Sequence, residues 1–154
     1  MQVSQTSSLD ESDLKILREL QRDARTSFKT IAQKVGVSEA TVFVRVRKMQ
    51  EKNVIKGFTT LVAPAAVGKP LTALVLVRSN PQAFTGTLEA LKKFEDIYEI
   101  YDVTGQYYSI LKIRTSGTEE LGKIMDEIGK INGIDGTETI IVLRTVKEDV
   151  TVRF

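Results

Sequence analysis

Apolar positions in the first sixty residues recur at helical spacing in three short stretches. Asp10 fits the N-cap of the first stretch, because its short carboxylate can accept free N–H groups of the first turn. Ser27 fits the N-cap of the second, and Gly36 suits the left-handed residue that ends it. Ser38 fits the N-cap of a third helix that ends at Asn53. The three apolar stripes are Leu14, Ile16, Leu17 and Leu20, then Phe28, Ile31, Ala32 and Val35, then Val42, Val46 and Met49.

Two short helices joined by a glycine-containing turn are typical of the helix-turn-helix motif, whose second helix enters the major groove of DNA. On the third predicted helix Val42, Val46 and Met49 share one sector and face the core. Val44 then points to solvent beside two cations, a position that suits contact with thymine methyl groups. The alternative is that Val44 and Phe43 pack on a neighbouring element while the cations are only solvated.

We predict three kinds of DNA contact from this helix and from the start of the helix before it. Ser27 has an alternative role, since it needs only to cap its own helix. The predicted set is Ala40 and Val44 for thymine methyls, Thr41 and Arg47 for base edges, Arg45 and Lys48 for phosphates, and Ser27, Lys29 and Ser38 at the two helix starts.

The rest of the chain alternates predicted strands and helices in the order βαββαβ, the ferredoxin-like arrangement. Gly105-Gln106 predicts a two-residue type II′ hairpin turn. Both faces of the first strand are apolar, so we expect a homodimer whose sheets pack face to face. The predicted elements are a strand over Leu71–Ser79, a helix from the cap Asn80 to about Phe94, strands over Ile97–Thr104 and Tyr107–Arg114, a helix opened by a Ser116–Glu119 capping box, and a strand over Thr137–Thr145.

Between these halves, Phe58–Val62 predicts a short strand and Pro64–Gly68 one helical turn. The fold class is therefore α+β, with a helix-turn-helix (winged-helix-like) domain joined to a ferredoxin-like domain. The expected division is a disordered leader at 1–8, the helix-turn-helix domain at 9–57, a structured linker strand at 58–70 and the βαββαβ domain at 71–154.

Charge and composition narrow the function further. Residues 1–57 carry eleven Lys/Arg and seven Asp/Glu, whereas residues 58–154 carry eleven and thirteen, so the cationic half is the one expected to meet a polyanion. The chain has no Cys or His, which excludes the usual triads and thiolate or imidazole metal sites and argues against an enzyme. We expect no cofactor, no membrane span and a cytoplasmic location, since no apolar run is long enough for a bilayer.

Five segments together resemble the leucine-responsive regulatory protein (Lrp/AsnC) family of transcription regulators. They are Leu9–Leu17, Ile31–Ser38, Arg45-Val46, Val54–Gly57 and Asp102–Gly105. The resemblance implies a DNA-binding regulator whose second domain dimerises, assembles further, often into octamers, and binds an amino-acid effector. It places the effector site at the hairpin and the last strand, with Asp102, Gly105, Gln106, Tyr107, Tyr108, Thr137 and Thr139 as candidate contacts.

Tyr108 departs from the family pattern, in which an Asp often stands at that place. Asp102 has an ordinary alternative as a solvated carboxylate at a strand end. Because neighbouring strand residues alternate, at most one of Tyr107 and Tyr108 faces the core of the sheet. A homodimer predicts a pseudo-palindromic site on double-stranded DNA. The alternatives are an architectural DNA-coating protein without an effector and a stand-alone amino-acid-sensing module.

Overall fold

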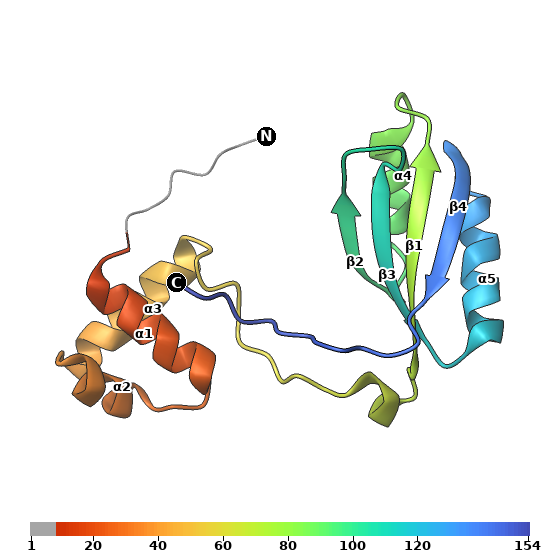
Figure 1. Ribbon diagram of the computed structural model, residues 1–154. Coiled ribbons are helices and arrows are strands. Elements are labelled where there is room, and N and C mark those ends of the chain that lie inside the picture. The colour runs from red at the N-terminus through yellow and green to blue at the C-terminus, as the bar shows by residue number, and fades with distance from the viewer. Residues whose placement is uncertain (1–8) are drawn as a thin grey trace. The chain divides into compact units, whose positions relative to one another are not determined.

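The computed structural model describes residues 9–154, and the predicted leader at 1–8 lies outside them. The described chain forms two compact units, each considered by itself (Figure 1). The first, which we call the head, contains residues 9–60 and Asp149–Phe154. The second, the sheet unit, is Leu61–Glu148. The expected limits of 9–57 and 71–154 differ from these units at the linker and at the last six residues.

The head is built from α1 (Glu11–Arg22), α2 (Phe28–Val35) and α3 (Glu39–Glu51). Each helix begins at the predicted cap, and the chain turns at the two predicted left-handed residues, Gly36 with φ 81° and Asn53 with φ 58°. The described part of the head contains no strand that could form a wing.

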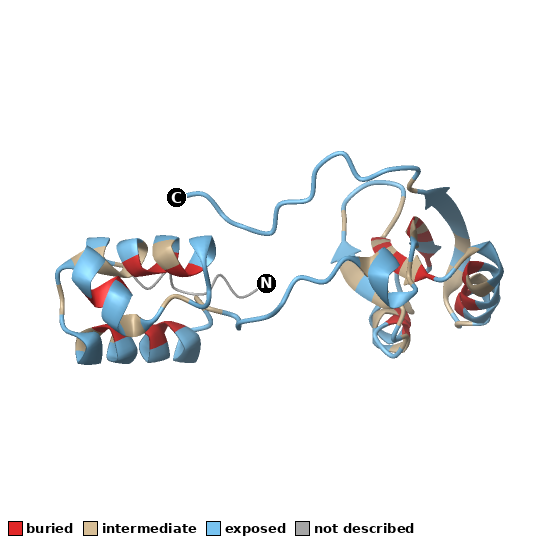
Figure 2. Ribbon diagram, turned by 90° about the horizontal axis from the view of Figure 1, so that it is seen from below, coloured by how far each residue is buried: buried red, intermediate tan, exposed pale blue. Residues whose placement is uncertain are grey.

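The core of the head lies where the three helices meet, and Figure 2 shows the buried segments of the head in red. Ile16, Ile31 and Val42 are fully buried, one from each helix. Val46 and Met49 are 3% exposed, which confirms the predicted inward side of α3. The last residues of the chain also belong to this unit, since the Arg18 guanidinium donates to the Phe154 carbonyl oxygen at 3.0 and 3.3 Å.

No strand forms at Phe58–Val62, so that prediction is wrong. A strand needs a neighbouring strand to pair its backbone N–H and C=O groups. Phe58, Leu61 and Val62 are instead each about half exposed or more. The predicted helical turn is present as a 3-10 helix, η1 (Pro64–Val67), which ends at the left-handed Gly68.

The sheet unit has the predicted βαββαβ order and one antiparallel sheet with strand order β2-β3-β1-β4. Figure 1 shows α4 and α5 on the same face of this sheet. We call that face the helix side and the other the open face. The elements are β1 (Leu71–Ser79), α4 (Phe84–Leu91), β2 (Ile97–Asp102), β3 (Ser109–Thr115), α5 (Thr118–Gly129) and β4 (Ile134–Ile141).

The two faces of the sheet differ in burial. Val75, Val77 and Leu111 on the helix side are fully buried against the two helices. Leu74 and Leu76 alternate with them along β1 and are only half-buried on the open face. The burial pattern therefore agrees with the predicted second apolar face of the first strand.

Several local predictions in the sheet unit need correction, among them the end of the first helix, which lies at Leu91 and not at about Phe94. Asn80 does not cap α4, because its carboxamide oxygen accepts from the Gln82 N–H and the helix begins only at Phe84. The hairpin is wider than two residues, since the Val103 N–H donates to the Tyr108 carbonyl oxygen around it. The α5 N-cap is Gly117, and the Ser116 N–H bonds to Glu120 rather than to the predicted Glu119. The last strand starts and ends earlier than Thr137–Thr145, at Ile134–Ile141.

Candidate nucleic-acid interface and effector site

The exposed side of α3 carries the residues predicted to meet DNA. Ala40, Val44, Arg47 and Lys48 are exposed, and Val44 shows 60% of its surface although it is apolar. Thr41 is half-buried near the helix start, where its N–H donates to the Ser38 hydroxyl at 3.0 Å. The structure therefore brings this part of the predicted set onto one face.

The two arginines of α3 have different surroundings. Arg47 is exposed and pairs with Glu51, one turn later on the same helix, with Nε and Oε1 3.1 Å apart. Such a surface pair stabilises little and can open to bind another acceptor. Arg45 instead crosses to α1, where it contacts Asp10 and Asp13.

The start of α2 presents a second part of the predicted set. The Ser27 hydroxyl accepts from the Thr30 N–H at 3.2 Å, so Ser27 does cap its helix. Lys29 follows and is exposed. Phe43 reaches this helix from α3, with its ring centroid 6.3 Å from that of Phe28. The alternative interpretation, in which an outward apolar side chain packs on a neighbouring helix, therefore applies to Phe43. Val44 stays exposed.

A groove that the sequence did not predict lies beside this face of α3. It has a volume of about 570 Å³ and lies between the start of α1 and one side of α3. Asp13 contributes from α1, and Lys52 extends the row of cations beyond Lys48. Asp13 and Arg45 are far apart in the sequence, so no local signal could have paired them.

The candidate effector residues gather at one end of the sheet. In the register of the sheet, Asp102 on β2 lies opposite Ser109 on β3, and Ser109 lies opposite Val77 on β1. Val77 in turn lies opposite Thr137 on β4. These residues therefore form one row across four strands. At about 4.8 Å per strand spacing the Cα atoms of Asp102 and Thr137 are roughly 14 Å apart, so the structure does not bring these two into contact.

The two hairpin tyrosines point in different directions, as alternation predicted. The Tyr107 hydroxyl donates to Glu138 on β4, and this hydrogen bond raises the pKa of the tyrosine. The Tyr108 ring packs on Phe84 at the start of α4, with centroids 5.5 Å apart. Glu138 was missed at the sequence level, although it lies between the two candidate threonines of β4. Gly105, with φ 121°, and Gln106 are exposed in the turn, as are Thr137 and Thr139 on β4.

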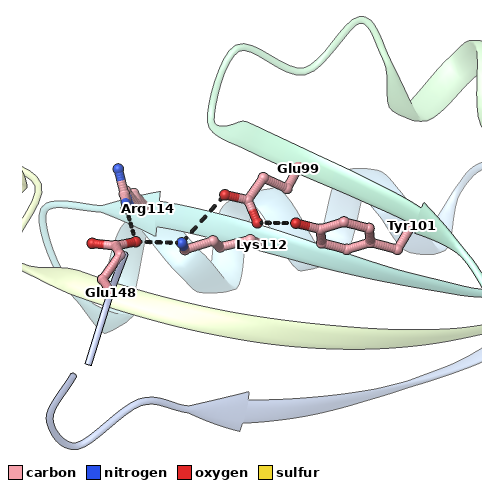
Figure 3. A network of polar contacts seen from close by, with 5 residues as sticks. All are labelled: Glu99, Tyr101, Lys112, Arg114 and Glu148. Atoms are coloured by element: carbon pink, nitrogen blue, oxygen red, sulfur yellow. Dashed lines mark hydrogen bonds and ion pairs between the residues drawn. The ribbon is translucent and has the colours of Figure 1, made fainter. Parts of the chain in front are cut away.

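One end of the open face carries a connected set of charges, drawn in Figure 3. Lys112 donates to Glu148 at 2.7 Å and to Glu99 at 3.3 Å, and Arg114 donates to Glu148 at 3.0 Å. The Tyr101 hydroxyl completes the set by donating to Glu99 at 2.7 Å. The hydrogen bond to Glu148, together with Glu99, raises the pKa of Lys112, so this ammonium stays charged on the half-buried face.

Comparison with known proteins decides the family. The family model of the AsnC-type helix-turn-helix domain matches residues 9–50, and that of the Lrp/AsnC ligand binding domain matches residues 72–152. The chain belongs to the Lrp/AsnC family. No α-helix in the described part of this regulator is both long and apolar enough to span a bilayer.

Named relatives agree with this assignment. The chain is 40% identical over 141 residues to the HTH-type transcriptional regulator FL11 of Pyrococcus abyssi, with 92% of this chain and 93% of the relative covered. It is 37% identical to the HTH-type transcriptional regulator Ptr1 of Methanocaldococcus jannaschii, with 91% and 95% covered. These relatives are transcription regulators and not enzymes, and the chain is accordingly a helix-turn-helix transcription regulator with a ligand-binding domain.

Solved structures share the same fold. The Escherichia coli AsnC structure matches with a TM-score of 0.87 at 28% identity and covers 94% of this chain and 98% of that one. The regulator NMB0573 from Neisseria meningitidis, solved as an L-Met complex, matches with a TM-score of 0.86 at 19% identity, covering 95% and 97%. The second likeness shows the fold alone.

Proposed function

We propose that this regulator binds a pseudo-palindromic DNA site through the exposed side of α3 and responds to an amino acid. The observation that carries the DNA-binding part is Val44, an apolar residue 60% exposed between cations on a well-capped helix. In this proposal Ala40 and Val44 contact thymine methyls, and Thr41 and Arg47 read base edges. Ser27, Lys29, Ser38 and Lys48 hold the phosphate backbone.

Fluorescence anisotropy with a duplex from the regulator's own promoter tests this part, against a scrambled duplex of equal length. We expect tighter binding to the promoter duplex, and the difference should persist at physiological salt. If both duplexes bind equally there, only the phosphate interaction remains and sequence-specific binding is excluded. An architectural DNA-coating protein would give that result.

The effector site in this proposal is the end of the sheet around the hairpin and β4. Asp102 supplies a carboxylate for an α-amino group, while the turn around Gly105 and Gln106 supplies backbone donors for an α-carboxylate. Thr137 and Thr139 add hydroxyl groups. Because the two sides of this end are well separated, a second copy of the chain completes the site. The match of residues 72–152 to the Lrp/AsnC ligand binding domain supports a small-molecule ligand, and the L-Met complex of the Neisseria regulator of the same fold suggests an amino acid as its class.

A thermal-shift screen with the twenty amino acids tests the effector. A ligand that binds only the folded state raises the melting temperature through mass action. We expect at least one amino acid to do so, and Asp102→Ala to reduce that shift. If no amino acid shifts the melting temperature of the wild-type protein, the amino-acid effector is excluded.

The open face of the sheet is the proposed dimer interface. Leu74 and Leu76 leave it partly apolar, while the helix side is already covered. We expect Leu76→Asp to convert the dimer to a monomer in analytical ultracentrifugation, and Lys123→Asp, on the exposed side of α5, to leave it intact. A dimer that survives Leu76→Asp would exclude this face. In this proposal the dimers assemble further, up to an octamer, and the regulator is located in the cytoplasm.

A further inference from the structure

Arg45 lies in the middle of α3, but its charged group contacts α1. One guanidinium nitrogen, Nη1, donates to Asp10 Oδ2 at 2.6 Å and to Asp13 Oδ1 at 2.8 Å. The Arg45 side chain is 30% exposed and that of Asp13 only 17%. Hydrogen bonds between oppositely charged groups are shorter and stronger than neutral ones. The charge of Arg45 is therefore engaged inside the head.

The same two carboxylates form the capping box of α1. Asp10 Oδ1 accepts from the Asp13 N–H at 2.8 Å, and Asp13 Oδ2 accepts from the Asp10 N–H at 3.2 Å. Each carboxylate thus uses one oxygen for the first turn of α1 and its other oxygen for Arg45. The pKa of Asp10 is lowered first by the Asp13 N–H and then by Arg45. The cap of α1 and the position of α3 are consequently joined through two side chains.

These three residues, which we call the α1–α3 clamp, border the groove beside the DNA-binding face. Ala40 and Val44, proposed to contact thymine methyls, line the α3 wall of that groove. A small rotation of α3 about its own axis would move both methyl-contacting residues away from the base edges. The clamp opposes such a rotation because Arg45 projects from the same helix and is held at two points.

We propose that Arg45 is a positioning residue that fixes α3 on α1, and that it does not contact a DNA phosphate. The proposal rests on the proposed DNA-binding function and revises the phosphate role predicted for Arg45 from the sequence. To reach a phosphate, the guanidinium would have to leave Asp10 and Asp13. Two unpaired carboxylates would then remain beside a polyanion, where like charges repel. Lys48, an exposed cation on the same groove, takes the phosphate contact.

The salt dependence of DNA binding separates the two roles of a cation. The logarithm of affinity falls with the logarithm of salt concentration, by about 0.9 in slope for each phosphate neutralised. The experiment measures anisotropy on promoter and scrambled duplexes over a salt series, well below the melting temperature. We expect Lys48→Met to lower the slope by about 0.9 on both duplexes. Arg45→Met should leave the slope unchanged but reduce the preference for the promoter duplex by about tenfold, as a mismatched base pair does.

A role in stability alone would not change this preference, because a smaller folded fraction weakens both duplexes equally. Asp13→Asn, which removes the negative charge of the partner rather than the cation, should reduce the preference in the same direction as Arg45→Met. The double variant should add little to Arg45→Met, because Arg45→Met already removes the contact with Asp13. Arg45→Lys, which keeps a donor for one carboxylate, should recover part of the preference.

The proposal is overturned if Arg45→Met lowers the slope by about 0.9, or if Asp13→Asn leaves the promoter preference intact. Failure of the proposed function itself has a different signature, since the wild-type protein would then not distinguish the two duplexes. In that case the melting temperatures of the two single variants and the double variant still test the clamp. Additive losses of stability would show that Arg45 and Asp13 act independently.

Discussion

The head and the sheet unit form their helices for different reasons. Every helix of the head starts at a side chain that accepts from its first turn, namely Asp10, Ser27 and Ser38. The two α-helices of the sheet unit have Ala83 and Gly117 at the N-cap position, and neither makes such a side-chain hydrogen bond. Local sequence therefore defines the head, whereas packing on the sheet defines α4 and α5. The helix ends of a unit of the second kind are harder to predict from the sequence, and its helices depend more on packing in the core.

We expect the largest loss of stability from substitutions in the hydrophobic cores of the two units. Ile31 in the head and Ile113 in the sheet unit are both fully buried. We expect Ile31→Ala and Ile113→Ala each to destabilise its own unit by roughly 2–5 kcal/mol, because each removes buried methyl groups and leaves a cavity. Differential scanning calorimetry should show a lower melting temperature for the substituted unit. A common shift of all transitions would contradict the division into two units.

Arg47→Ala addresses the function of the head without affecting its core. Arg47 is exposed and held only by a surface pair with Glu51. We expect discrimination between the promoter site and single-base variants to fall by roughly 1–3 kcal/mol at one base position. Equal weakening on every sequence would instead make Arg47 a phosphate contact. Glu51→Ala, which removes only the partner, serves as the control and should keep the discrimination.

Ser38→Ala measures how much one helix N-cap contributes to the stability of the head. The Ser38 hydroxyl accepts from the Thr41 N–H, so its loss leaves that donor without its partner. We expect a destabilisation of about 1 kcal/mol in chemical unfolding followed by circular dichroism. Thr85→Ala in the first turn of α4, which has no side-chain cap, should change stability by no more than about 0.5 kcal/mol. Equal losses at both sites would remove the contrast between the units.

Acid should reveal the one strong polar contact at the start of α5. The Ser116 N–H, followed by the Ser116 side chain and Lys69, lowers the pKa of Glu120 to about 2. A carboxylate with a lowered pKa stabilises the fold above its unfolded value, and this contribution is lost as the pH falls through the folded value. The melting temperature of the sheet unit should therefore drop between about pH 4.5 and pH 2.

Glu120→Gln should make that part of the pH profile flatter, because the side chain no longer titrates. Glu119→Gln, which affects only an exposed pair with Lys123, should leave the profile unchanged. A profile that stays steep in Glu120→Gln would assign the acid sensitivity to other carboxylates.

The head could be predicted almost residue by residue because its signals are local. Gly36 and Asn53 adopt the expected left-handed conformation, and the buried side of α3 follows from helical spacing alone. The clamp could not be predicted, since Arg45 meets Asp10 only after the helices have packed. The α3 face was therefore predictable as a surface, but the surroundings of one of its cations were not.

In the sheet unit the order of the elements and both ends of β1 were predictable, whereas the ends of the later elements were mostly not. The Asn80 N–H donates to the carbonyl oxygen of Gly133 at 2.8 Å, a contact with a distant part of the chain. A Cβ at Gly133 would lie 2.3 Å from that of Ala83, so the two segments meet closely just before α4. This contact accompanies the later start of α4, and nothing near Asn80 in the sequence announces it. The candidate effector residues likewise depend on strand register, which placed Tyr107 against Glu138.

The contact between Arg18 and Phe154 has a practical consequence for dissecting this regulator. The Arg18 guanidinium also lies 5.6 Å from the centroid of the Phe154 ring, so α1 holds the last residue by its side chain and its backbone. A fragment that stops at Thr60 would lack this part of the head. An excised DNA-binding fragment should therefore carry Asp149–Phe154, joined through a linker, if it is to keep the same surface on α1.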